Sequence, residues 1–203
     1  MKVVGLGGSM AELSRSRTAL RASLAGAAGA GAETELLDLR ELALPMFNPD
    51  DAPGDAASRL IDVCYSADAM VWASPLYQGS ISGAFKNALD WLHDLGTRDP
   101  AFLHDKVVGL ISTAGGIQGL QAINAMEFSA RALRAWTVPY VVPIGPASRV
   151  FAKDGLIVDD AVAAQLRTLG EEVVRAAQRF QADAALHREE ACADAAERVA
   201  VAS

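Results

Sequence analysis

The segment KVVGLGGSMAELSRSRTAL, residues 2–20, joins a short apolar run to a polar loop and then to the start of a helical pattern. The apolar run Lys2–Gly7 predicts a buried first strand that ends at glycines. Apolar residues recur at helical spacing within Arg15–Gly29, and the glycines of residues 26–31 favour an end to this helix. A buried strand followed directly by a helix is the first half of a βαβ unit.

The rest of the chain repeats this alternation. Further strands are expected at Glu33–Leu39, Ala69–Ala73, Lys106–Ile111 and Tyr140–Ile144, and helices at Asp55–Asp68, Ser82–Leu95, Leu120–Trp136 and Ala161–Phe180. The expected connections are the Pro-rich loop Arg40–Gly54, the polar turn Ser74–Ser80, the Gly-rich loop Ser112–Gly119 and the segment Ser148–Asp160, a loop or short hairpin turning at Asp154-Gly155. Strands separated by helices predict an α/β fold with a mostly parallel, doubly wound sheet. Function in such folds lies at the carboxyl ends of the strands.

The composition indicates a folded, acidic protein. The chain has 203 residues, of which 51% are hydrophobic and 21% charged, and its formal net charge is −7. These values exclude wholesale disorder. An acidic surface repels phosphate backbones, so nucleic acid is not expected as the main partner. No apolar run reaches the length of about 18 residues that a membrane span needs, and a soluble, cytoplasmic protein is expected.

The cysteines and histidines show no spacing typical of a metal site. Cys64 and Cys192 lie far apart, and each is expected to be a buried or inert thiol. His93, His104 and His187 form no paired motif, so no metal is expected.

The loop after the first predicted strand has two interpretations. Gly5–Met10 nearly matches the G-x-G-x-x-G dinucleotide fingerprint, with Met10 at the third glycine position and Asp38 as a candidate ribose-binding acid. The hydroxyl and guanidinium groups that follow favour a phosphomonoester site instead, because a helix N-terminus adds free N–H groups and partial positive charge. These groups belong to Ser9, Ser14, Ser16, Thr18, Arg15 and Arg17. A purely structural role, with Ser14 as an N-cap and solvated arginines, is the alternative.

The segment SPLYQGSISGAFKNALDW, residues 74–91, follows the third predicted strand. Tyr77 offers a flat face and a hydroxyl group, and Gly79 and Gly83 permit close backbone approach. This combination suits a planar heteroaromatic ligand. A helix start capped by Ser80 or Ser82 is the alternative, and Phe85 and Trp91 are expected in the core.

This segment resembles the NADPH-dependent FMN reductase family, whose members carry P-x-Y-x-x-S-x-x-G-x-L-K-N-A-L-D-W here. The matching residues are Pro75, Tyr77, Ser80, Gly83, Lys86, Asn87, Ala88, Leu89, Asp90 and Trp91, whereas Phe85 replaces a leucine and Gln78 an asparagine. The first loop resembles the family's G-S-x-R-x-x-S-x-N phosphate loop at Gly8, Ser9 and Ser14, with Ser16 in place of the asparagine. Ala11 stands where the family often has arginine, so Arg15 or Arg17 would have to supply the cation.

The resemblance implies a flavodoxin-like, three-layer α/β/α fold with a five-stranded parallel sheet of order 2-1-3-4-5. FMN would bind at the switch point between strands one and three. We expect residues 1–182 to form the FMN-binding domain and residues 183–203 an Ala-rich tail. The resemblance also implies a homodimer or homotetramer packed through the helix after Ser80, with Lys86, Asp90 and Trp91 in or near the interface.

The third loop, Ser112–Gly119, has glycines at 115, 116 and 119 that leave its backbone bare. On the residues alone, a turn that needs positive φ is an equal alternative. The resemblance places this loop against the pyrimidine end of the flavin, where N–H donors stabilise negative charge. The expected FMN-binding residues are therefore Ser9, Ser14, Ser16, Arg17, Pro75, Leu76, Tyr77, Gln78, Thr113, Gly115 and Gly116.

No side chain has the pattern of a nucleophile or general base, which fits chemistry carried by the flavin. The expected activity is an FMN reductase that works by a ping-pong mechanism. NADPH or NADH would pass a hydride to N5 of FMN, and a free flavin, quinone or similar small acceptor would then be reduced. Three alternatives stay open: a flavin enzyme acting on one metabolite, a flavodoxin-type electron carrier, and a Rossmann NAD(P) enzyme.

Overall fold

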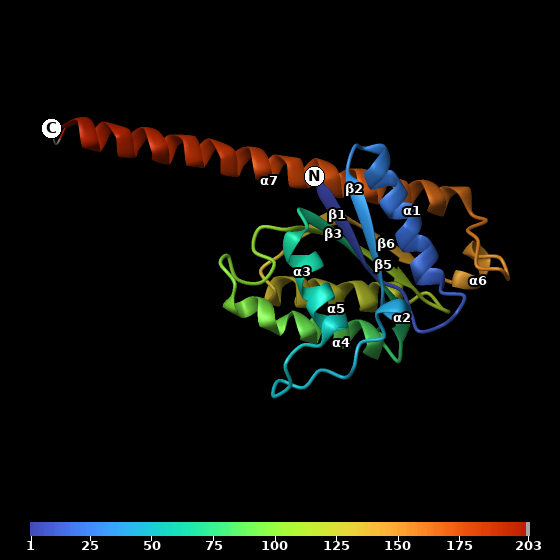
Figure 1. Ribbon diagram of the computed structural model, residues 1–203. Helices are drawn as coiled ribbons and strands as arrows, with labels where there is room; N and C mark the ends of the chain where they lie inside the picture. Colours follow the sequence, from blue (N-terminus) through green and yellow to red (C-terminus); the bar gives the residue numbers. More distant parts are fainter. Residues whose placement is uncertain (202–203) are drawn as a thin grey trace.

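The computed structural model describes residues 1–201, with side chains described for residues 1–183. Five parallel strands form a sheet in the order β2-β1-β3-β5-β6, which is 2-1-3-4-5 when these five are numbered along the chain (Figure 1). The strands are β1 (Lys2–Gly7), β2 (Glu33–Asp38), β3 (Ala69–Tyr77), β5 (Val107–Thr113) and β6 (Trp136–Ile144). The predicted doubly wound α/β sheet is confirmed.

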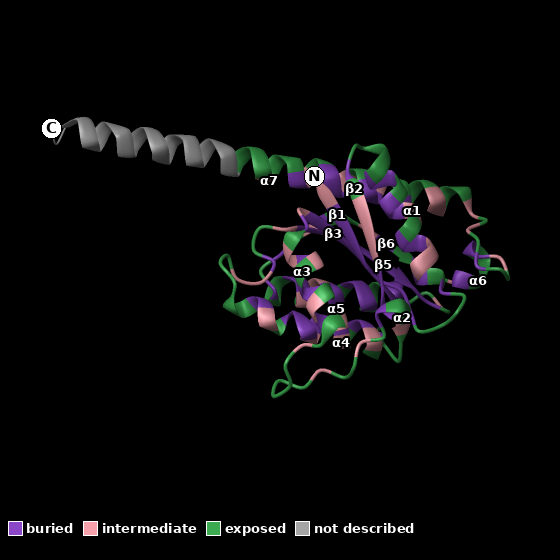
Figure 2. Cartoon of the chain, viewed as in Figure 1, coloured by how far each residue is buried: buried purple, intermediate pink, exposed green. Residues whose placement is uncertain are grey.

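Helices cover both faces of this sheet, as Figure 1 shows. One layer holds α1 (Arg15–Gly29) and α7 (Asp160–Val201), and the other holds α3 (Asp55–Ser66), α4 (Gly83–Trp91) and α5 (Gly119–Ala132). Figure 2 shows the buried strands between the two helical layers. Because both faces are covered, β5 is buried at every position and reads as a continuous apolar run rather than an alternating one.

Each face has its own hydrophobic core. On the α3–α4–α5 side, Trp72 of β3 packs edge-on against Phe85 of α4, with ring centroids 5.8 Å apart. Trp91 is buried in the same core, so the expectation that Phe85 and Trp91 are core residues is confirmed. Because Trp91 is buried within the protomer, its side chain cannot form part of the oligomer interface in which the resemblance placed it. Cys64 is fully buried there as well, and burial raises the pKa of its thiol, as expected for an inert cysteine.

The end of β3 differs from the prediction. The strand runs on to Tyr77 and forms a hairpin with a two-residue antiparallel strand, β4 (Ser80–Ile81). Gln78 and Gly79 form the two-residue turn, with φ of 49° and 83°, as in a type I′ turn. The segment Ser74–Ser80 is therefore largely strand, and the prediction of a polar turn there was wrong. A sequence pattern of apolar runs misses such a hairpin because its paired residues are half-exposed.

The boundary between α5 and β6 also differs from the prediction. The predicted helix Leu120–Trp136 ends at Ala132, and β6 begins at Trp136, four residues before its predicted start. Arg134, at φ 63°, reverses the chain between them. The helix α4 begins after Ser82, whose Oγ accepts the Phe85 N–H at 3.2 Å, and a 3₁₀ turn, Leu92–Thr97, follows it.

Helix α7 is longer than predicted. It spans Asp160–Val201, so the expected boundary between residues 182 and 183 falls within a helix. Its first turns pack on α1 and on the sheet through Leu166, Leu169 and Val173. Within residues 1–201, no helix combines the length and apolar character needed to cross a membrane.

Candidate functional site

A cleft of about 260 Å³ opens at the carboxyl edge of the sheet. It is bounded by the loops that follow β1, β5 and β6 and by the last residues of β3, so four segments far apart in the sequence meet there. This is where ligands bind in open α/β sheets. The lining residues are Ser9, Ala11, Leu13, Arg15, Ser16, Pro75, Leu76, Tyr77, Thr113, Ala114, Gly115, Ala147, Ala152, Lys153 and Gly155.

One end of the cleft carries a chain of buried hydroxyl groups. The Ser9 Oγ donates to the Ser14 Oγ at 3.0 Å, and the Ser14 and Ser16 Oγ atoms lie 3.2 Å apart. Ser14 caps α1, because its Oγ accepts the Arg17 N–H at 3.2 Å. Ser14 therefore does not line the cleft itself but orients the two hydroxyls that do. The first turn of α1 brings unpaired N–H groups to the same place, as a phosphate site requires.

The two arginines of α1 have different positions. Arg15 lines the cleft, whereas Arg17 lies outside the lining and pairs with Asp38 at 2.7 Å between Nη1 and Oδ2. Residues two apart on a helix point in nearly opposite directions, so one turn cannot aim both guanidinium groups at the same ligand. The sequence analysis offered Arg15 or Arg17 as the cation that replaces the family's arginine at position 11. Of these two, only Arg15 lines the cleft.

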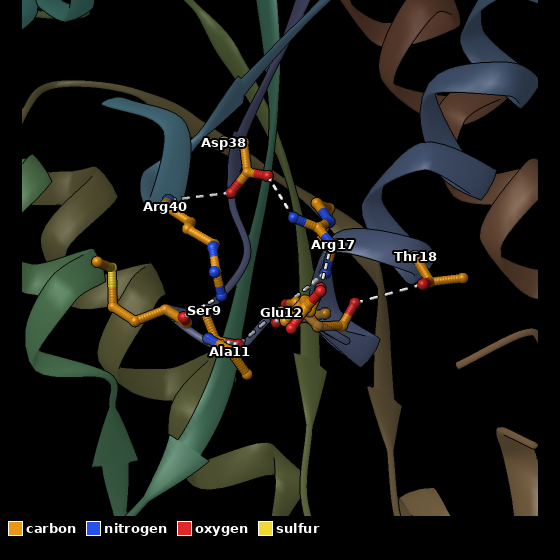
Figure 3. Close-up of polar contacts among 10 residues, drawn as sticks. Ser9, Ala11, Glu12, Arg17, Thr18, Asp38 and Arg40 are labelled. Atoms are coloured by element: carbon orange, nitrogen blue, oxygen red, sulfur yellow. Dashed lines mark hydrogen bonds and ion pairs between the residues drawn. The ribbon is translucent and has the colours of Figure 1, made fainter. Parts of the chain in front are cut away.

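Asp38 holds the loop after β1 in place, as Figure 3 shows. Its side chain is fully buried and accepts from Arg17 and from the Arg40 N–H. The two guanidinium groups also donate to loop carbonyls, Arg17 to Glu12 at 2.5 Å and Arg40 to Met10 at 3.1 Å. Asp38 is thus occupied by the Arg17 guanidinium and the Arg40 N–H and is not presented as a ribose-binding acid, which removes one of the two features that supported the dinucleotide interpretation.

We expect Asp38→Ala to weaken FMN binding about tenfold and to lower the free energy of unfolding by about 2 kcal/mol. The variant leaves the Arg17 guanidinium half-buried without its partner and releases the exposed loop of residues 10–13. Urea unfolding and a flavin fluorescence titration measure the two effects. The matched control is Arg59→Ala, which breaks an exposed ion pair with Glu35 and should cost less than about 0.5 kcal/mol. Equal losses in the two variants would contradict this role for Asp38.

The end of β3 contributes apolar and aromatic side chains to the cleft. Pro75 and Leu76 of β3 line it, and Tyr77 presents a ring that is 54% exposed. The buried Ser74 fastens this segment, because its Oγ accepts the Ser82 N–H at 3.0 Å and donates to the Pro75 carbonyl at 2.9 Å. Gln78 forms the hairpin turn and lies outside the lining. Apolar side chains beside an aromatic ring suit a planar ligand.

The loop after β5 contributes backbone atoms that no side chain covers. Ala114 is held on both sides, since its N–H donates to the Ile144 carbonyl and its carbonyl accepts the Ala147 N–H, both at 2.8 Å. Gly115 lines the cleft, and a Cβ built there meets no atom within 4 Å. Gly116 lies outside the lining. A Cβ on Gly145 would come 2.1 Å from the Gly116 carbonyl oxygen, so this part of the loop packs tightly on the end of β6.

The cleft fits FMN in its chemistry. Hydroxyls, helix N–H groups and Arg15 lie at one end for a phosphate, and Pro75, Leu76, Tyr77 and the bare Gly115 lie at the other for a ring. Within residues 1–183 no cluster of three or more His, Cys, Asp or Glu side chains could hold a metal. His187 and Cys192 lie outside the described side chains.

The sequence analysis missed the contribution of the segment after β6. Ala147, Ala152, Lys153 and Gly155 line the cleft, although this segment was expected only to be a loop or short hairpin. The hairpin is confirmed by the Phe151–Ile157 bridge and by Gly155 at φ 85°. The only available signal was its position after the last strand, since all such loops emerge at the same edge of a parallel sheet.

Comparisons with known proteins agree with this geometry. Residues 1–148 match the family described as NADPH-dependent FMN reductase. An NADPH azoreductase from Bacillus sp. (strain OY1-2) is 32% identical over 131 residues, which cover 64% of this chain and 69% of the relative. An NAD(P)H:quinone oxidoreductase from Solanum tuberosum is 28% identical over 190 residues, covering 83% and 89%. The solved structure of FerB, a flavoenzyme NAD(P)H:(acceptor) oxidoreductase from Paracoccus denitrificans, superposes with a TM-score of 0.71 at 23% identity, covering 88% of this chain and 98% of FerB.

Proposed function

The chain belongs to the NADPH-dependent FMN reductase family, and from this premise we propose that it oxidises NAD(P)H and reduces a small acceptor in two alternating half-reactions. The observation that carries the proposal is that one cleft is lined both by Ser9, Ser16 and Arg15 and by Pro75, Leu76 and Tyr77. Bound FMN supplies the two-electron chemistry. Free flavin, a quinone or an azo compound is the proposed acceptor, by analogy with the named relatives.

The protein's own groups would bind and orient the cofactor. Ser9, Ser16 and Arg15 would hold the phosphate, with Ser14 ordering the two lining hydroxyls. Pro75, Leu76 and Tyr77 would support the ring, and the backbone from Thr113 to Gly115 would approach its edge. Backbone N–H donors held in place before the reaction stabilise charge that develops there without reorganisation. Residues 1–182 contain all of these groups, and we propose that they form the FMN-binding unit.

The test is an anaerobic visible spectrum of the purified protein with FMN, before and after NADPH is added. The flavin band near ~450 nm should bleach on a catalytic timescale and return when a quinone or excess FMN is supplied. Flavin that binds but is not bleached would instead indicate an electron carrier. A protein that binds no flavin would overturn the proposal.

We also propose that the protein forms a homo-oligomer through α4. Lys86 and Asp90 form an exposed i,i+4 ion pair on this helix. Beside it lies an apolar groove of about 240 Å³, which Phe47, Leu89 and Phe102 help to line. An exposed apolar groove rimmed by charge is typical of a protein–protein contact.

Lys86→Glu should shift the protein toward monomer. The substitution places two like charges four residues apart on α4 and repeats the repulsion in every symmetric copy. Sedimentation velocity of the variant and of Arg59→Glu, an equivalent charge reversal on the exposed face of α3, distinguishes a local from a general effect. An unchanged sedimentation coefficient for Lys86→Glu would remove α4 from the interface.

A further inference from the structure

The hairpin between α6 (Ala147–Val150) and α7 has a defined structure. Its base is tied by the Phe151–Ile157 bridge and by hydrogen bonds from the Ala152 N–H to the Leu156 carbonyl at 2.8 Å and from the Val158 N–H to the Val150 carbonyl at 2.9 Å. Val150 and Phe151 are buried in the core beneath it. The hairpin is therefore anchored at its base, and its tip has a defined position relative to the sheet.

This hairpin places Lys153 at the same cleft as Arg15. Lys153 lines the cleft from the C-terminal side of the chain, and Arg15 lines it from the N-terminus of α1. The two elements are adjacent because α1 and α7 pack on the same face of the sheet. Two cations from opposite ends of the sequence thus face one ligand site.

The cleft is electropositive in an otherwise acidic protein. The chain has a net charge of −7, but the residues that line the cleft include Arg15 and Lys153 and no aspartate or glutamate. Within the described side chains, neither cation has a hydrogen-bond or ion-pair partner. The carboxylate next to Lys153, Asp154, accepts the Leu156 N–H at 3.1 Å within the turn. Lys153 and Arg15 are therefore both available to an anion.

A phosphomonoester dianion carries close to two negative charges, and each cation that reaches it adds a charge-assisted bond to those from hydroxyls and helix N–H groups. Ala11 brings only a methyl group to the cleft, and Arg17 is held by Asp38. Building on the proposed function, we propose that Lys153 is a specificity-determining residue that pairs with Arg15 to bind the 5′-phosphate of FMN. Through this contact the protein distinguishes FMN from riboflavin, which has the same ring but no phosphate.

The proposal is tested by titrating flavin-free protein with FMN and, separately, with riboflavin. Lys153→Gln should raise the Kd for FMN about tenfold, because one charge-assisted bond to phosphate is lost. The Kd for riboflavin should not change, and Lys153→Arg should bind FMN within about twofold of the parent protein, because it keeps the charge. The difference between the parent and Lys153→Gln should shrink at high salt.

Leu156→Gln is the control variant, because Leu156 is 62% exposed on the same hairpin and does not line the cleft. It should leave both affinities unchanged. Equal weakening of FMN and riboflavin by Lys153→Gln, or no weakening of either, would overturn the assignment. A change confined to the ratio of KM values for NADPH and NADH would also overturn it, by moving Lys153 to the dinucleotide phosphate. If the parent protein binds neither flavin, the proposed function itself fails.

Discussion

Replacing Gly115 by valine should weaken FMN binding about 100-fold and leave the fold intact. A Cβ at Gly115 meets no protein atom within 4 Å, and the residue does not have positive φ. Since Gly115 lines the cleft, the added methyl groups would enter the space proposed for the ring. Overpacking of a fitted site typically costs 1–3 kcal/mol, so the Kd for FMN should rise by about 100-fold.

This result is measured by fluorescence titration with FMN together with thermal unfolding of the flavin-free protein. The control is Gly29→Val. Gly29 is the last residue of α1, far along the helix from Arg15, and a new Cβ there also meets no atom within 4 Å. Both variants should unfold within about 2 °C of the parent, and only Gly115→Val should show the raised Kd for FMN. A Gly115→Val protein with full flavin occupancy would exclude the loop after β5 from the ring site.

Replacing Gly170 by alanine should destabilise the protein by about 3 kcal/mol, at the upper end of overpacking effects. Helices α1 and α7 approach each other backbone to backbone at this point. A Cβ on Gly170 would lie 2.0 Å from the Ser23 carbonyl oxygen, and one on Gly26 would lie 2.2 Å from the Arg167 carbonyl oxygen. Backbone atoms cannot rotate away, so the two helices would have to separate.

Urea unfolding of Gly170→Ala and Gly29→Ala separates this packing effect from helix propensity. Gly29 ends α1 in open space, so alanine there should be neutral or slightly stabilising, by up to about 0.5 kcal/mol. If alanine lowers the free energy of unfolding at position 170 and does not lower it at position 29, the difference measures the contact between α1 and α7. A Gly170→Ala protein as stable as the parent would mean that the helices can part without cost.

Separation of α1 from α7 also has a functional consequence. Helix α1 carries Arg15 and Ser16 at its N-terminus, and α7 follows the hairpin that carries Lys153. A shift between the helices should move these groups relative to each other. We therefore expect Gly170→Ala to weaken FMN more than riboflavin, which connects a packing contact in the core with recognition of the phosphate.

Much of the fold could be predicted from the sequence because its signals are local. A buried strand between two helical layers is an apolar run, and four of the five parallel strands were located from such runs. The edge strand β2 was located from its alternation of polar and apolar residues. Strands β3 and β6 are longer than predicted, because they continue into residues that are partly or largely exposed: Leu76 and Tyr77 in β3, and Trp136, Thr137 and Pro139 in β6. The hairpin at Gln78 and Gly79 was missed for the same reason.

The sequence by itself determined the alternation of strands and helices, the three loops that carry the expected phosphate and ring contacts, and the family resemblance of residues 74–91. Only the tertiary structure decided which arginine faces the cleft, because Arg17 is drawn away by Asp38, a residue 21 positions along the chain. It also decided that the hairpin carrying Lys153 lines the same cleft as Arg15. Ion pairs and helix packing between distant segments set the direction of each side chain, and neither is encoded in local periodicity.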